Sequence, residues 1–452
     1  MKTKIDTRTL TLLHWRELTL KDCGLLYVLF SGAHVIIREP FEVYSAYVVA
    51  GFMALCALGR PGRLLSGPIT FLSVLGVVGY TGAMQWPGQG GFFKVFAVIV
   101  CVVLTSSLVM ALYNNDLVRL FRVYVFGCSC ASFLGILQIV ASKIGFQPLY
   151  NFGWLGLNKW GMSFEGPLGL RLNSLFSEPS QFCIIVSGAC FWSVCVLGFR
   201  VTHRRTRIAA FAILFAMLLT FSALLVPSLL LVAILAVKMR SRRPAAYLQF
   251  VLSILLCVST LRSAAISDRV TGVIDLATSE VGQSTLIVHG SSEVFYDHYR
   301  AAMYSLKRNA LTGAGLGMHE NVYRKYRISE GRWSTKAQET LLNVKDANSM
   351  LLRIISELGL FGVAGVIALL ARGWMPSGAM LDFRIISSAC LCIMGLQLVR
   401  QGNYVFCYFP MYFLWYLMAK RQATNRRRPG RPVSQIRRQK NVHTSQKHAI
   451  KT

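Results

Sequence analysis

An arginine and a carboxylate stand seven residues apart in a polar stretch that leads into an apolar segment. The stretch begins at Arg171 and reaches Glu178, which is followed by Pro179 and Ser180. A guanidinium suits a phosphate or diphosphate group, and a carboxylate can take a proton from a hydroxyl. Proline fits the first turn of a helix, so Glu178 is expected at or just before a helix start. There it could be a chemical group or only a helix cap, and spacing does not decide between the two.

A second polar group occupies residues 299–321. The residues before Asn309 have helical periodicity and include Arg300. The alternating glycines of residues 313–317 predict a flexible turn, but they are weak evidence for phosphate binding because no βαβ unit surrounds them and no Lys-Ser/Thr follows. His319 could be a ligand, a base or an ordinary surface histidine, and the sequence favours the last.

A third group, Asn348, Arg353 and Glu357, begins a later apolar segment. Arg353 and Glu357 are four residues apart, so they share a helix face and can pair. An ion pair within a membrane is costly unless it faces the bundle interior or a wet cavity. The pair is therefore either part of a site or a structural clamp between helices.

The elements that position these groups are predicted to be membrane-spanning helices. The chain has 452 residues, of which 54% are hydrophobic and 15% charged, and its apolar residues form long blocks. A soluble protein is nearly excluded, and the fold expected is an all-α polytopic membrane helix bundle. Twelve spans are predicted near residues 23–37, 42–59, 67–84, 93–112, 120–142, 181–199, 208–224, 225–239, 246–262, 348–371, 383–400 and 403–419.

Residues 208–239 are too long for one span, so we predict two short helices that turn at residues 226–228, around Pro227. A single span would also place the basic loops 200–207 and 238–243 on opposite sides of the membrane. Two helices keep both loops on one side.

Charge sets the orientation. The chain carries 48 Lys+Arg and 19 Asp+Glu, a net charge of +29. With both termini cytoplasmic, 30 of the basic residues face the cytoplasm, as the positive-inside rule requires. The basic tail, residues 420–452, is therefore expected to lie against anionic lipid headgroups rather than to bind nucleic acid.

These predictions divide the chain into five parts. Residues 1–22 form a cytoplasmic N-terminus, residues 23–262 hold spans 1–9 with an external loop at 143–180, and residues 263–347 form a large external loop. Residues 348–419 hold spans 10–12, and residues 420–452 are the tail. Nearly all of the 12 cysteines lie in apolar spans and none forms a CxxC pair, so neither a disulfide framework nor a metal site is expected.

Taken together, the three polar groups resemble the bacterial O-antigen polymerases and O-antigen ligases. The shared elements are the Arg-x6-Glu-Pro-Ser stretch that opens a helix, a late external loop with arginine, alternating glycines and histidine, and a following helix with the pattern Asn…Glu-Leu-Gly-x-x-Gly. The resemblance covers about residues 120 to 420. Many members, especially ligases, have His-Asn where this chain has Ala347 and Asn348, and this departure favours a polymerase.

The resemblance implies glycosyl transfer from undecaprenyl diphosphate at the external face of the inner membrane, with no nucleotide sugar, metal or other cofactor. It also implies a chain-length regulator and a flippase of the same pathway as partners. Arg171 and Arg300 would bind the diphosphate, and Glu178 would be the general base, with His319 as the alternative. Three further residues would shape the cavity floor: Asn348, Arg353 and Glu357.

Three alternatives to a polymerase stay open. A ligase would use the same donor with lipid A-core as acceptor. A flippase or other transporter would be expected to carry several cations deep within its spans, whereas this chain has only Arg353 there. A scaffold subunit without activity is the third.

Overall fold

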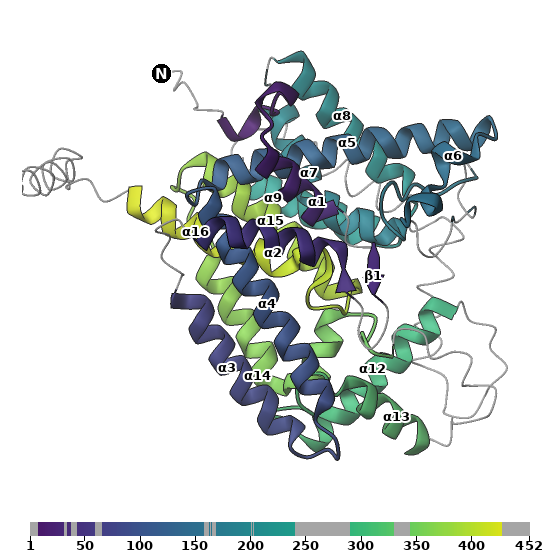
Figure 1. Ribbon diagram of the computed structural model, residues 1–452, viewed down its shortest axis with the longest axis vertical. Coiled ribbons are helices and arrows are strands. Elements are labelled where there is room, and N and C mark those ends of the chain that lie inside the picture. Colours follow the sequence, from purple (N-terminus) through teal and green to yellow (C-terminus); the bar gives the residue numbers. More distant parts are fainter. Residues whose placement is uncertain are drawn as a thin grey trace, which may run out of the picture.

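The described part of the protein is mostly helical, with connecting loops and one short β-hairpin (Figure 1). The computed structural model describes residues 8–30, 34–37, 43–58, 66–157, 169–199, 203–239, 290–329 and 344–426, with the single positions 162, 164 and 201. The helices are α1 (Leu20–Phe30), α2 (Ser45–Leu58), α3 (Ser66–Ala83), α4 (Gly90–Leu112), α5 (Leu117–Lys143), α6 (Gln147–Tyr150), α7 (Pro179–Gly198), α8 (Arg204–Leu219), α9 (Leu225–Met239), α12 (Gly290–Arg308), α13 (His319–Ser329), α14 (Met350–Gly373), α15 (Leu381–Arg400) and α16 (Phe409–Arg426).

Five of these helices are long and apolar enough to cross a membrane: α4, α5, α7, α14 and α15. They agree with the predicted helical membrane architecture. The predicted span at residues 246–262 and the basic tail beyond residue 426 lie outside the described residues, as do residues 263–289 and 330–343 of the predicted external loop 263–347. Of that loop, the structure describes residues 290–329 and the last few residues before α14.

The most buried membrane helix is α7, and α15 packs against it in the opposite direction. Thr9 touches both helices, because the Trp192 indole donates to its carbonyl and its own N–H donates to Asp382. Trp192 is near the end of α7, whereas Asp382 is near the start of α15. The two helices are therefore antiparallel, so the start of α7 lies at the level of the end of α15.

The predicted helical hairpin is present, but its turn was placed too late. The helices α8 and α9 are separated by residues 220–224, and Pro227 lies in the first turn of α9 rather than in the turn. A proline is tolerated there because the first N–H groups of a helix have no intrahelical partner.

The predicted first span, residues 23–37, is wrong in its second half. The helix α1 ends at Phe30, and β1 (Val35–Ile37) then pairs with β2 (Val43–Tyr44) as an antiparallel hairpin. Hydropathy alone cannot separate a helix end from a short strand of β-branched residues, which favour the extended conformation.

The predicted span at residues 348–371 is a broken helix. Gly359 has a left-handed φ of 56°, which separates a mostly buried half, up to Leu358, from an exposed apolar half that begins at Leu360. The residues after α12 fill the break, because the Leu360 N–H donates to the Ala310 carbonyl at 2.8 Å. The helix α14 packs against α3, and α12 and α13 also contact α14 (Figure 1).

The glycine turn at residues 313–317 is packed rather than flexible, and it is not a phosphate cradle. Gly315 has φ 98°, and a Cβ there would lie 2.1 Å from the backbone nitrogen of Ala83 on α3. At Gly317 a Cβ would lie 2.3 Å from the Gly91 carbonyl on α4. The glycines allow the close approach of three backbones.

Candidate functional site

The carboxylate of Glu178 stands at the start of α7 without capping it. Glu178 is the N-cap residue through its carbonyl, which accepts from the N–H groups of Gln181 and Phe182 at 3.1 and 3.3 Å. Its side chain makes no capping hydrogen bond. The Gln181 side chain accepts from the N–H of Ser177, which precedes the helix, at 3.2 Å. The Glu178 side chain thus plays no capping role, and the carboxylate remains available for chemistry.

Glu178 is half-buried and holds one hydrogen bond. Its Oε2 accepts from the Ser180 hydroxyl at 2.7 Å. Within the described part of the chain, no cation lies within ion-pair distance of this carboxylate. A carboxylate in this state can accept a proton from a substrate hydroxyl.

Arg171 lies beside the first turns of α7. Its Nε donates to the carbonyl of Thr220, the residue that follows α8, at 3.3 Å. The hydroxyl of the same threonine lies 3.2 Å from the Cys183 sulfur on α7. Arg171, which stands seven residues before Glu178 in the sequence, is therefore at the same end of α7, and it is half-buried.

A further cation, Arg400, lies at this level on α15. A Cβ at Gly188 would lie 2.8 Å from the Ala389 carbonyl, which aligns the two helices in register. The two helices run in opposite directions from this contact. Pro179, at the start of α7, and the last residues of α15 are therefore at about the same level. There the Arg400 guanidinium donates to the amide oxygen of Asn348. The sequence singled out Asn348 but not Arg400, because an arginine at a span edge has no distinguishing pattern.

The Arg353–Glu357 pair that the spacing predicts is present and buried, with Nε 2.9 Å from Oε1. Arg353 also donates to the Gly402 carbonyl at 3.0 Å and to the Asp346 carboxylate at 3.3 Å. The Tyr404 hydroxyl donates to Glu357 at 2.9 Å. The pair ties residues 402–404 to α14, which is the arrangement of a structural clamp. Gly402, Tyr404 and Asp346 could not be found from sequence, because no periodicity links them to α14.

His319 is fully buried, so the expectation of a surface histidine was wrong. Its Nδ1 lies 2.7 Å from the Ser356 hydroxyl, and its Nε2 lies 3.0 Å from Nδ1 of His298. The Ser356 hydroxyl donates to the Arg353 carbonyl, so His319 donates through Nδ1 and accepts through Nε2. Burial, His298 and the Arg353 charge together hold the pKa of His319 well below its usual value. Both ring nitrogens are engaged, which disfavours a role as the general base.

Arg300 lies on α12 and is half-buried. It occupies a different face of the helix from His298 and Ser305, whose side chains bond to His319 and to the Ser356 carbonyl. Its predicted contact with a diphosphate remains a prediction.

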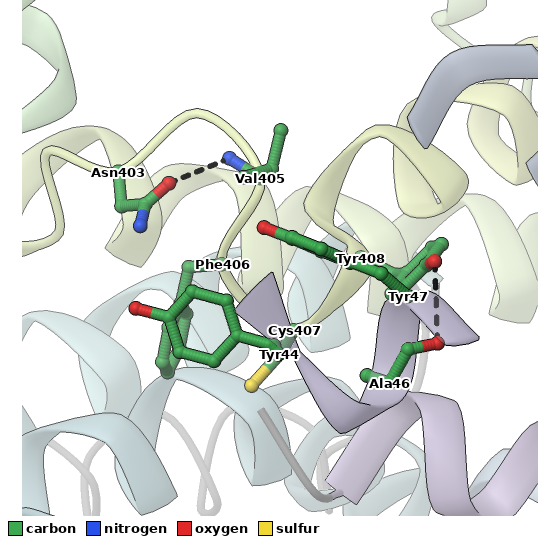
Figure 2. A pocket seen from close by; sticks show the side chains of 8 residues that line it. All are labelled: Tyr44, Ala46, Tyr47, Asn403, Val405, Phe406, Cys407 and Tyr408. Atoms are coloured by element: carbon green, nitrogen blue, oxygen red, sulfur yellow. Dashed lines mark hydrogen bonds between the residues drawn. The ribbon is translucent and has the colours of Figure 1, made fainter. Parts of the chain in front are cut away.

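A shallow pocket lies beside the loop after α15 (Figure 2). Aromatic rings of Tyr44, Tyr47 and Phe406 line it, and the Tyr408 hydroxyl beside them donates to the Ala46 carbonyl at 3.3 Å. It has room for about one water molecule and is too small for a sugar.

The described residues contain no group of three or more histidine, cysteine or acidic side chains that could hold a metal ion. Comparisons of the chain with protein families, with characterised proteins and with solved structures found no match. In the part of the chain that the structure describes, the fold is that of an α-helical protein with five helices suited to a membrane.

Proposed function

We propose that this protein is a glycosyltransferase that polymerises oligosaccharide repeat units carried on undecaprenyl diphosphate at the external face of the bacterial inner membrane. The resemblance of its three polar groups to O-antigen polymerases supports the reaction. The observation that carries the proposal is the Glu178 carboxylate, which is half-buried at a helix start, does not cap the helix and lies at the same end of α7 as Arg171.

In this proposal Glu178 accepts the proton of an acceptor hydroxyl on the lipid-linked repeat unit. The acceptor oxygen then bonds to C1 of the donor chain, and the bond from C1 to the diphosphate oxygen breaks. The negative charge that develops on the leaving diphosphate is stabilised by arginines, whose planar guanidinium can make two parallel hydrogen bonds to phosphate oxygens. Arg171 and Arg300 are the proposed ligands, and Arg400 lies at the level of Glu178.

The second buried cluster has a supporting role in this proposal. Arg353, Glu357 and His319 join α12 and α13 to the broken helix α14, and their polar groups bond one another. They hold the segment that carries Arg300 rather than touch the substrate.

The orientation of the chain can be tested with reporter fusions. A fusion at Gly290 is expected to be active as an external reporter and one at Gly430 as a cytoplasmic reporter, because this arrangement places the basic loops inside. The reverse pattern would overturn the proposed location.

The function is tested by reconstitution of the purified protein with lipid-linked repeat units. Formation of longer chains on undecaprenyl diphosphate supports the proposal. Transfer of the glycan only to lipid A-core would assign a ligase, and movement of the lipid across the bilayer without transfer would assign a transporter. A chain-length regulator added to the same vesicles is expected to change the length of the product.

A further inference from the structure

The serine of the Glu-Pro-Ser stretch bonds to Glu178 rather than to the helix backbone. Ser180 lies in the first turn of α7, and its hydroxyl donates to Oε2 of Glu178 at 2.7 Å. Two later serines on α7 behave differently. Ser187 donates to the Ile184 carbonyl at 2.7 Å, and Ser193 donates to the Ala189 carbonyl at 2.8 Å. Those two make the usual bond of a serine within a helix to a carbonyl of the preceding turn, whereas Ser180 lies in the first turn and has no helical turn before it.

Pro179 separates the two bonded residues. Its ring locks φ and removes the backbone N–H, which leaves few ways for the chain to move between positions 178 and 180. The Glu178 carbonyl accepts the first backbone hydrogen bonds of the helix, and its side chain makes no capping bond. The Ser180 hydroxyl has a single proton, and it uses that proton to donate a hydrogen bond to the carboxylate.

We propose that Ser180 is a positioning residue for the general base. The inference rests on the proposed function, in which Glu178 accepts the proton of the acceptor hydroxyl. Ser180 holds Oε2, so the carboxylate keeps one orientation and Oε1 is the oxygen that meets the acceptor. The proton moves from the acceptor oxygen to Oε1, while the serine keeps its own proton throughout.

The test compares Ser180→Ala, Ser180→Thr and the control Ser187→Ala in the reconstituted polymerisation assay. Loss of a hydrogen bond to a charged group predicts that Ser180→Ala lowers kcat about tenfold with KM unchanged. Ser180→Thr keeps the hydroxyl and should restore the rate. Ser187→Ala should behave like the wild-type protein.

Glu178→Gln separates failure of this inference from failure of the proposed function. If the wild-type protein polymerises, Glu178→Gln does not, and Ser180→Ala keeps the wild-type kcat, the positioning role is overturned while the base stands. If Glu178→Gln polymerises normally, the base assignment itself is wrong, and the positioning role falls with it. In the double variant Glu178→Gln/Ser180→Ala, a rate equal to that of Glu178→Gln alone supports the inference. A further tenfold loss contradicts it, because Ser180 would then act independently of the carboxylate.

Discussion

The starts of α7 and α14 both carry a charged pair that the sequence singled out, yet the structure treats the two pairs differently. At α14, Arg353 and Glu357 bond to each other, are buried and are bonded further by Tyr404 and the Gly402 carbonyl. At α7, Glu178 is half-buried and holds a single hydrogen bond, from Ser180.

This difference separates a clamp from a candidate site. A buried ion pair with further hydrogen bonds is costly to break and has little capacity left for a substrate. A half-buried carboxylate with one donor can still exchange a proton with a ligand. The number of hydrogen bonds and the burial of each group, rather than charge alone, show where chemistry is possible.

The largest expected effect is at Glu178. Glu178→Gln should lower polymerisation by about two to four orders of magnitude, because glutamine cannot accept the proton. Stability should change by no more than about 1 kcal/mol, since the Glu178 side chain makes no capping hydrogen bond. The rate is measured with lipid-linked repeat units, and Glu320→Gln on α13 is the control that should retain activity. Equal rates for Glu178→Gln and Glu320→Gln would mean that the carboxylate at the start of α7 is not a base. The contrast between α7 and α14 would then be lost.

At α14 the expected loss is one of stability. Arg353→Ala should lower the free energy of unfolding by about 3–5 kcal/mol, because it leaves the buried Glu357 without its cation. Unfolding in detergent micelles measures this effect. The control is Arg324→Ala, which breaks the more exposed pair with Glu320 on α13 and should cost no more than about 1 kcal/mol. Similar losses in the two variants would show that the buried pair is not a clamp.

A smaller loss of activity is expected at Arg171. Arg171→Lys keeps the charge but loses the planar guanidinium, so it should cost about 2–4 kcal/mol of transition-state stabilisation. The measurement is kcat/KM with lipid-linked donor, and Arg308→Lys on the exposed side of α12 is the control. Wild-type chain lengths from Arg171→Lys at normal expression would contradict diphosphate binding by this residue.

The smallest effect is a pH dependence at the α14 cluster. The pKa of His319 is lowered in the folded protein, so below about pH 6.5 the unfolded state binds a proton that the folded state does not. Stability of the segment formed by α12 and α13 should therefore fall as the pH is lowered from about 7 to about 5. Hydrogen exchange of the amides in α13 at the two pH values, corrected for intrinsic exchange, measures the change.

The control for this pH dependence is at the opposite end of the bundle, where Arg119 pairs with the buried Asp22 at 2.5 Å. Burial raises the pKa of Asp22, but hydrogen bonds from Arg119 and Thr19 outweigh burial and leave this pKa lowered. Its contribution is present above about pH 4 and is lost only below it, so amides of α1 should not change over the same range. Equal loss of protection in α1 and α13 would point to general unfolding rather than to His319.

The sequence alone was sufficient for features that depend on neighbouring residues. Hydropathy identified the apolar helices, the proline at position 179 marked the start of α7, and the spacing of Arg353 and Glu357 predicted their pairing. These predictions succeed because helix periodicity and capping act within one turn. Hydropathy failed where a strand follows α1 and where Gly359 breaks α14, since apolar composition is common to helices, strands and broken helices.

Only the tertiary structure decided which distant groups meet. It placed His298 against His319, brought Tyr404 to Glu357 and set Arg400 at the level of Glu178. It also showed that the Glu178 side chain makes no capping hydrogen bond to α7, which separates its carboxylate from the capping role that the sequence left open. The physical reason is that contacts between helices depend on their packing, direction and register, and no local pattern of residues encodes these.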